Sequence, residues 1–349
     1  MRWKKTLQLL DVHCEGEVGK VVTSGVYDIP GNTMIEKMDY INKENDSLRR
    51  FVCLEPRGAV NQTVNLMIPP CDPTADAGFI VLQADEAHPM SGANTMCVAT
   101  ALLETGMIEM KEPETTLRLE APAGIVTATA ECKDGKCKRV ALDMIPSFVE
   151  ALDQTVRTEE WGEVKLDIAF GGVFYAVVFV DQLGIEITPQ YTADLVRAGM
   201  VIKEAANKAF TVEHPEIPSI DHIAYTIFAH RQTDGSVRTC CTLWPGRVDR
   251  SPCGTGSSAI LSVLHARGEV VVGGEITTRS IIDSEFKVQL KGETELAGKK
   301  AILPNISGRC WTYGISQLAL DPDDPFANGF VLPDTWGPEA VHIHCLNNR

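Results

Sequence analysis

Two short segments of the chain each place a Ser or a Cys directly before a glycine and a helical run. In the first, Ser91 leads into a run that ends at Gly106; in the second, Cys253 leads into a run that ends at Gly268. The spacing is the same in both, and glycine suits the left-handed backbone that commonly ends a helix. We therefore expect two similar domains, each of which presents one Ser or Cys at the start of a helix.

The start of a helix suits both anion binding and thiol ionisation. Its first backbone N–H groups lack an intrahelical acceptor and carry the positive end of the helix dipole. We expect these N–H groups, which belong to Gly92, Ala93, Gly254 and Thr255, to hold an anionic group such as a carboxylate. A thiol in the same place loses its proton more readily, so Cys253 is expected to act as an acid/base.

Each of these residues also has a simpler interpretation. Ser91 could serve only as a helix N-cap, and Cys253 could be a buried small hydrophobic residue. The glycine-rich segment around Cys253 could suggest a phosphate loop, but it lacks the lysine that such a loop requires.

Two further side chains are candidates for substrate contacts. Asp249, four residues before Cys253, could accept a hydrogen bond from an ammonium or imino group, or could be a surface turn carboxylate beside Arg250. His222 could contact a hydroxyl group, although a lone histidine beside apolar residues is more often structural. We include both Asp249 and His222 in the predicted site.

The elements around these residues indicate a mixed α/β chain in which strands outnumber helices. Apolar periodicity predicts helices over 33–50, 92–105, 187–208 and 254–267, and strands over 6–12, 19–25 and 164–180. Phe174 and Tyr175 lie in the last of these strands, and we assign both to the core. Asp134-Gly135 predicts a hairpin turn between Cys132 and Cys137, and a zinc site there would need a second ligand pair that is not evident.

The composition bounds the class of protein. With 349 residues the chain can bury two cores, and its net charge of −15 opposes binding to nucleic acid or to a membrane surface. No run approaches the length of a spanning helix, and no secretory signal leads the chain. Eleven scattered cysteines indicate reduced thiols in a cytoplasm, and apart from Cys253 we interpret them, Cys240 and Cys241 included, as packing residues.

Four motifs, spread over nearly the whole chain, match those of a known family: Asp11-Val12-His13, Met90-Ser91-Gly92, Gly171-Gly172-Val173-Phe174-Tyr175-Ala176 and Asp249-Arg250-Ser251-Pro252-Cys253-Gly254-Thr255-Gly256. With them the chain resembles the proline racemase family. The resemblance implies the diaminopimelate-epimerase-like fold, with two similar α/β domains, each a curled sheet around a central helix, and an active site in the cleft between them. It places the domains at 1–150 with 329–349 and at 151–328.

The resemblance also implies cofactor-independent proton chemistry at the α-carbon of proline or a hydroxyproline, without a metal. In the family, two cysteines face opposite sides of that carbon. Here Ser91 stands in place of the first cysteine, and Ala93 stands where racemases commonly have a histidine. Inversion needs two competent acid/bases, and a serine hydroxyl is a much weaker acid than a thiol. We therefore predict a hydro-lyase that dehydrates trans-3-hydroxy-L-proline to Δ1-pyrroline-2-carboxylate.

Two alternatives remain open from the sequence. The first is a 4-hydroxyproline 2-epimerase in which Ser91 is activated well enough to serve the opposite face. The second is a protein that binds an imino acid without catalysis, for which the Cys253 thiol would be unnecessary. The expected partner in every case is a small imino acid, and a homodimer is the expected assembly.

Overall fold

The chain folds into two compact units. The computed structural model describes residues 3–218, 220–337, 340 and 343. Unit 1 comprises residues 1–142 and 308–349, and unit 2 comprises residues 143–307.

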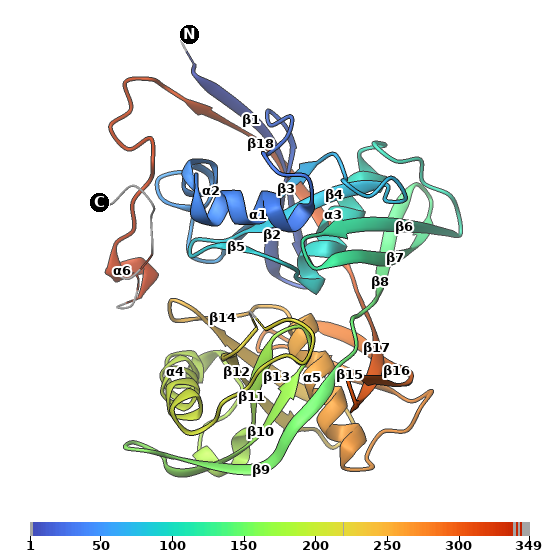
Figure 1. The fold of residues 1–349 in the computed structure, drawn as a ribbon, viewed down its shortest axis with the longest axis vertical. Helices are drawn as coiled ribbons and strands as arrows, with labels where there is room; N and C mark the ends of the chain where they lie inside the picture. The colour runs from blue at the N-terminus through green and yellow to red at the C-terminus, as the bar shows by residue number, and fades with distance from the viewer. Residues whose placement is uncertain (1–2, 219, 338–339, 341–342, 344–349) are drawn as a thin grey trace. The chain divides into compact units, whose positions relative to one another are not determined.

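The described residues of unit 1 form a twisted sheet and four helices (Figure 1). Its elements in chain order are β1 (Lys5–Cys14), β2 (Glu17–Ser24), α1 (Met34–Lys43), α2 (Ser47–Cys53), β3 (Gln62–Ile68), β4 (Ala77–Leu82), β5 (Ala87–His88), α3 (Gly92–Glu104), β6 (Glu114–Ala121), β7 (Gly124–Lys133), β8 (Lys136–Asp143), β18 (Cys310–Leu320) and α6 (Pro333–Trp336).

Unit 2 has a second sheet with its own long helices. Its elements are β9 (Phe148–Thr158), β10 (Gly162–Phe170), β11 (Phe174–Phe179), η1 (Val180–Leu183), η2 (Pro189–Tyr191), α4 (Thr192–Ala209), β12 (Ile223–Arg231), β13 (Val237–Leu243), β14 (Arg247–Val248), α5 (Gly254–Ala266), β15 (Glu275–Arg279), β16 (Glu285–Leu296) and β17 (Lys299–Gly308).

The two units repeat one strand topology. In unit 1, β18, β1 and β2 are antiparallel, β2 and β3 are parallel, β3 and β4 are antiparallel, and β4 and β6 are parallel. The corresponding strands of unit 2 are β9, β10 and β11, then β12, β13 and β15, with the same order of antiparallel and parallel pairs. Parallel neighbours need a crossover, and α3 and α5 supply the second crossover in each unit.

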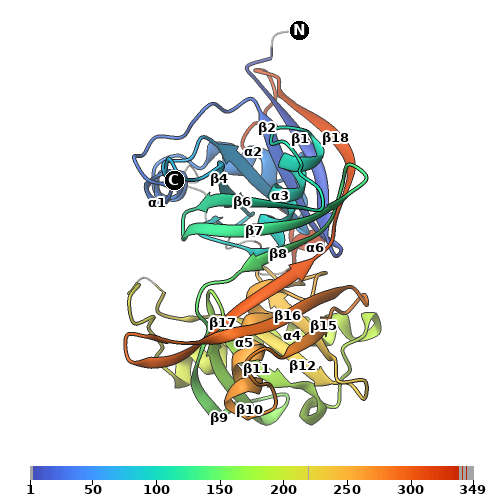
Figure 2. The ribbon, with the colours of Figure 1, turned by 90° about the vertical axis from the view of Figure 1, so that its right-hand side faces the viewer.

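Helices α3 and α5 lie inside their sheets (Figures 1 and 2). Nearly all of their residues are buried, because both sequences are apolar or small on every face. Gly106 and Gly268 follow their last turns with φ of 72° and 74°, as the sequence predicted. The expected fold, two similar α/β units built around a central helix, is confirmed.

The unit boundaries differ from the predicted domain boundaries. The predicted domains were 1–150 with 329–349 and 151–328. The first segment of unit 1 ends at residue 142, not 150, and unit 2 ends at residue 307, not 328. Strand pairing explains the difference, because β9 pairs along its length with β10 of unit 2, while β18 pairs with β1 of unit 1. Residues 344–349 of the predicted first domain lie outside the described residues.

Several local predictions are confirmed. The hairpin between β7 and β8 turns at Asp134 and Gly135, with φ of 57° and 69°. The predicted helix over 33–50 forms as α1 and α2, and the predicted strand over 164–180 forms as β10 and β11. Gly171 and Gly172 lie between β10 and β11, where they interrupt the predicted strand.

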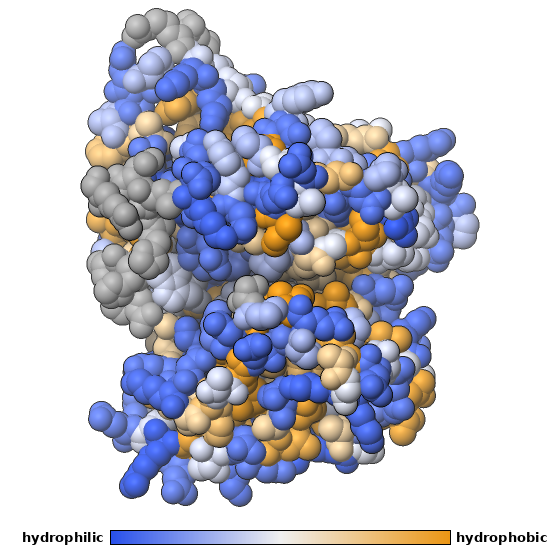
Figure 3. Space-filling view, viewed as in Figure 1, coloured by the Kyte–Doolittle hydropathy of each residue, from blue (hydrophilic) through white to orange (hydrophobic). Residues whose placement is uncertain are grey.

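Polar side chains spread over much of the face shown in Figure 3, with apolar residues between them. Among the described helices, none combines the length and apolar character needed to cross a membrane.

Candidate active site

Cys253 is held directly before α5 in an unusual backbone conformation. Its φ is +66°, a region that non-glycine residues seldom adopt, and its side chain is 6% exposed. Such strain costs on the order of 1–3 kcal/mol and is found mostly at functional sites. The simpler interpretation of Cys253, a packing residue, does not account for this conformation.

Polar groups from neighbouring strands surround the Cys253 sulfur. The hydroxyl of Tyr175 lies 3.5 Å from the Cys253 Sγ and 2.7 Å from the Thr255 Oγ1. Tyr175 comes from β11, and Cys241, the main cause of the lowered pKa of Cys253, comes from β13, two strands away in the sheet.

These contacts favour the thiolate. Hydrogen bonding from Cys241 outweighs the opposing effect of burial and, with the Tyr175 hydroxyl and the Gly256 N–H, lowers the pKa of Cys253 from 9.0 to about 7. Burial raises the pKa of Tyr175 and that of Cys241 well above their ordinary values, so both stay protonated and act as donors. Cys253 is therefore suited to accept and return a proton near neutral pH.

Glycines let the backbone of α5 approach these strands. A Cβ on Gly171 would lie 2.1 Å from the Thr255 carbonyl oxygen and 2.7 Å from the Ala259 nitrogen. A Cβ on Gly256 would lie 3.0 Å from the Cys253 Sγ. The Gly171-Gly172 motif thus seats the first turn of α5 against the start of β11.

Asp249 organises the loop that leads into Cys253. Its Oδ1 accepts hydrogen bonds from the Ser251 N–H at 2.8 Å and from the Ser251 hydroxyl at 2.9 Å, and the Ser251 Oγ accepts from the Cys253 N–H at 3.2 Å. Asp249 is 8% exposed, so it is not the surface carboxylate that the alternative interpretation described.

Ser91 occupies the equivalent position before α3 in unit 1, but in an ordinary extended conformation with φ of −153°. Its side chain makes no cap hydrogen bond to the helix backbone. Instead its Oγ accepts a hydrogen bond of 2.9 Å from the Nδ2 of Asn94. The interpretation of Ser91 as a cap alone is therefore not supported by the geometry.

The four residues predicted to bind a carboxylate through their N–H groups form the first turns of the two buried helices. Gly92 and Ala93 begin α3, and Gly254 and Thr255 begin α5. Because the Ser91 side chain makes no cap hydrogen bond, it leaves the N–H groups at the start of α3 for a ligand.

His222 lies apart from the contacts described around Cys253. It directly precedes β12, its side chain is 64% exposed, and its Nδ1 lies 3.1 Å from an Asp221 carboxylate oxygen. Its role in the site stays a prediction.

Sequence reasoning missed Tyr175, Cys241 and Asn94. Tyr175 and Cys241 are buried, as predicted, but each also favours the Cys253 thiolate: the Tyr175 hydroxyl lies 3.5 Å from the Cys253 Sγ, and hydrogen bonding from Cys241 lowers the pKa of Cys253. One signal was available for Tyr175. The sequence placed it in the core, where the structure shows it at 1% exposure, and a buried hydroxyl requires a polar partner. Cys241 carried no such signal, since a buried cysteine is ordinarily apolar packing.

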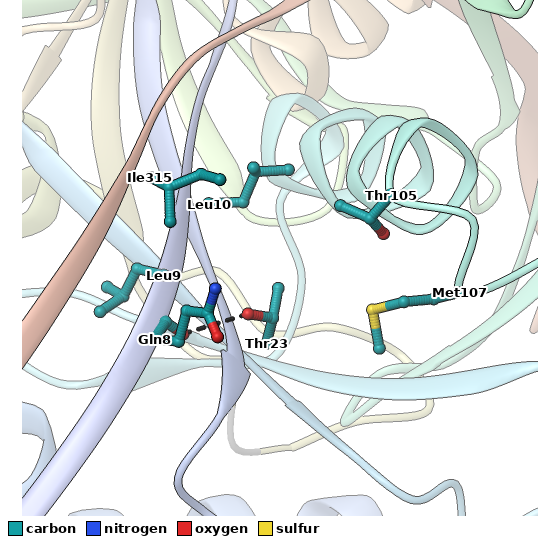
Figure 4. A pocket seen from close by; sticks show the side chains of 7 residues that line it. All are labelled: Gln8, Leu9, Leu10, Thr23, Thr105, Met107 and Ile315. Atoms are coloured by element: carbon teal, nitrogen blue, oxygen red, sulfur yellow. Dashed lines mark hydrogen bonds between the residues drawn. The ribbon is translucent and has the colours of Figure 1, made fainter.

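An apolar pocket of unit 1 lies at the opposite end of α3 from Ser91 (Figure 4). Thr105, the C-cap residue of α3, lines it together with Gln8, Leu9, Leu10, Thr23, Met107 and Ile315. None of these side chains is an acid or base near neutral pH, so the pocket does not carry the predicted chemistry. Within the described part of the chain, no group of three or more His, Cys, Asp or Glu residues is arranged to hold a metal ion.

The sequence of residues 9–331 matches the family described as proline racemase. The chain belongs to the proline racemase family. This match takes in both helix starts, with Ser91 and Cys253.

Two relatives that match over their full length are named for the same activity. The chain is 57% identical over 345 residues to "4-hydroxyproline 2-epimerase 1" of Rhizobium rhizogenes, covering 98% of this chain and 100% of the relative. It is 55% identical, with the same coverage, to "4-hydroxyproline 2-epimerase" of Agrobacterium fabrum.

Solved structures agree with these relatives. A hydroxyproline epimerase from Agrobacterium vitis with bound trans-4-hydroxy-L-proline has a TM-score of 0.92 at 55% identity, covering 98% of this chain and 100% of that one. A phenazine biosynthesis protein of the PhzF family from Bacillus anthracis covers 90% of this chain and 100% of its own at a TM-score of 0.58 and 13% identity, a likeness of fold alone.

The predicted dehydration of trans-3-hydroxy-L-proline is wrong. Relatives at 54–57% identity over nearly the whole chain are named 4-hydroxyproline 2-epimerases, which contradicts the predicted hydro-lyase. The prediction rested on the weak acidity of a free serine hydroxyl. It neglected the environment of Ser91, where a helix start and the Asn94 amide both favour negative charge on the oxygen.

Proposed function

We propose that this protein interconverts trans-4-hydroxy-L-proline and cis-4-hydroxy-D-proline by inverting the configuration at the α-carbon. The observation that carries the proposal is the Agrobacterium vitis epimerase with bound trans-4-hydroxy-L-proline, to which the chain is 55% identical at a TM-score of 0.92. The acidified thiol of Cys253 supports the same chemistry, because α-proton transfer needs a base that is ionised near neutral pH.

In the proposed mechanism Cys253 and Ser91 act on opposite faces of the α-carbon. For one diastereomer, the Cys253 thiolate takes the α-proton, and the electron pair left on carbon is delocalised into the carboxylate as an enolate. The Ser91 hydroxyl then gives its proton to the other face, which leaves a thiol and an alkoxide. The other diastereomer reacts by the reverse path. The 4-hydroxyl is retained because its carbon is not adjacent to the carbanion.

Binding groups follow from the same arrangement. We infer that the N–H groups of Gly92, Ala93, Gly254 and Thr255 hold the carboxylate and stabilise the enolate charge. Asp249 is assigned to the ring nitrogen. His222 is assigned to the 4-hydroxyl.

The test is incubation of the protein in D2O with each 4-hydroxyproline diastereomer in turn. We expect optical rotation to move toward one equilibrium mixture from both sides, with deuterium at the α-carbon of the product by NMR. Both substrates returned without inversion would overturn the proposal. Cytoplasmic location and a homodimer stay predictions. Light scattering after gel filtration measures the mass of the assembly and so tests the homodimer.

A further inference from the structure

A chain of two asparagines leads from the interior of unit 1 to the Ser91 hydroxyl. The Nδ2 of Asn65 on β3 lies 2.9 Å from the Oδ1 of Asn94 on α3, and the Nδ2 of Asn94 lies 2.9 Å from the Ser91 Oγ. Both asparagines are buried, at 0% and 4% exposure. The backbone of Ser91 is fixed separately, because its carbonyl accepts from the Thr95 N–H at 2.9 Å and the Thr95 hydroxyl at 2.8 Å.

The direction of this chain is set at its inner end. The Asn65 Nδ2 also donates to the carbonyl oxygen of Lys20 at 3.3 Å, and a backbone carbonyl can only accept. The Asn65 amide is therefore oriented with its NH2 group toward Lys20 and Asn94. Asn94 in turn must present its oxygen to Asn65 and its NH2 group to Ser91.

This orientation determines what the Ser91 hydroxyl can do. One lone pair of the oxygen accepts from Asn94, so the hydroxyl hydrogen is left to be donated elsewhere. When that proton leaves, the same Asn94 N–H becomes a charge-assisted hydrogen bond to an alkoxide. An ordinary N-cap serine would instead accept from a backbone N–H of the first turn, which here stays open for a carboxylate.

We propose that Asn94, oriented by Asn65, is a positioning residue that makes Ser91 an effective proton donor and acceptor. The inference rests on the proposed epimerase function and extends it, because it explains how a serine serves the face opposite Cys253. No new covalent step is needed: the proton passes between the Ser91 oxygen and the α-carbon, and Asn94 exchanges no proton.

A glycine in the neighbouring strand supports this role. A Cβ on Gly19 of β2 would lie 2.7 Å from the Asn94 Oδ1 and 3.2 Å from the Asn65 Nδ2. Gly19 is not among the residues with positive φ, so its backbone does not require glycine. The space that it leaves is filled by the two amides.

The experiment uses the full chain with the substitution Asn94→Ala in D2O. It measures two rates separately: inversion to the other diastereomer, and uptake of deuterium into the starting diastereomer without inversion. We expect inversion to fall about 10- to 100-fold, the effect of losing a hydrogen bond to a charged group. For the diastereomer whose α-proton Cys253 removes, exchange with retention should persist, so the ratio of exchange to inversion should rise at least tenfold. For the other diastereomer, both rates should fall together.

Two further variants and a control keep the result interpretable. Asn65→Ala should raise the same ratio by a smaller factor, and it decides the question if Asn94→Ala does not fold. Asn42→Ala is the matched control. Asn42 is another asparagine of unit 1, whose amide hydrogen-bonds to the backbone of Ala87 at 2.8 and 2.9 Å, so its loss should leave the ratio unchanged.

An unchanged ratio in Asn94→Ala, or an equal fall of exchange for both diastereomers, would overturn the role of Asn94 while leaving the epimerase function intact. Absence of inversion by the unaltered protein would overturn both, because Ser91 would then have no proton to deliver. The two failures are therefore distinguishable.

Discussion

At the scale of single residues, the two acid/base candidates are activated by different means. Cys253 is strained and receives hydrogen bonds from Cys241 and Tyr175, which lower its pKa to about 7. Ser91 is unstrained, and its hydroxyl oxygen accepts a hydrogen bond from Asn94. Sequence alone identified Ser91 and Cys253 from their matched spacing. It missed their donors because strand pairing and helix packing, which local spacing does not reveal, bring these side chains to Cys253 and Ser91.

Tyr175→Phe should move the pH dependence of epimerisation. With Cys253 and Ser91 both protonated, neither face of the substrate has a base, so kcat/KM for both diastereomers should fall as pH drops through about 7. Loss of the tyrosine hydroxyl removes a donor to the thiolate and should raise the pKa of Cys253 by roughly one unit. The acidic limb of the profile should shift upward by the same amount.

The rate of alkylation of Cys253 against pH gives an independent measurement of that pKa. Tyr191→Phe is the matched control, because Tyr191 packs at the edge of the core of unit 2. Identical profiles for Tyr175→Phe and the unaltered protein would show that the hydroxyl does not stabilise the thiolate.

At the scale of elements, close packing of α5 against its sheet sets the position of Cys253. The turn between β10 and β11 approaches the first turn of α5 through Gly171, which has backbone atoms of Thr255 and Ala259 as neighbours. The sequence predicted the strands and the helix separately from their periodicity. It could not predict which loop touches the helix start, because that depends on the order of strands in the sheet.

Gly171→Ala should destabilise unit 2 by about 1–3 kcal/mol, the usual effect of forcing an extra methyl into packed backbone. It should also lower kcat, because the first turn of α5 has to move. Thermal unfolding and steady-state kinetics measure the two effects. Gly292→Ala is the control: its added Cβ would meet only Leu303, at an ordinary 3.7 Å. Equal stabilities of the two variants would contradict the proposed close packing.

At the scale of the whole molecule, one strand topology occurs twice and the C-terminal segment returns to the first unit. Strand β18 pairs with β1, and Arg57 then binds the following segment through Asp324 at 2.9 Å and the carbonyl of Ala327 at 3.0 Å. The net charge of −15 opposes binding of any anion. The carboxylate site that we propose therefore depends on local helix N–H groups.

A chain that ends at Ser307 should lose the fold of unit 1 and keep that of unit 2. Without β18, the inner strand β1 becomes an edge and its apolar face is uncovered. Hydrogen exchange read by mass spectrometry should show lost protection in residues 5–142 and retained protection in residues 148–299. Full protection of β1 in the shortened chain would contradict this assignment.

The sequence by itself determined the local features of this protein: where α3 and α5 begin and end, the hairpin turn at Asp134, and a Ser and a Cys, our two acid/base candidates, at matched places. These follow from backbone preferences and short-range periodicity, which a few neighbouring residues encode. Tertiary structure alone decided that Tyr175 and Cys241 meet the Cys253 sulfur and that Asn65 orients Asn94 toward Ser91. Such contacts join strands and helices far apart in the chain, so strand pairing and packing set them.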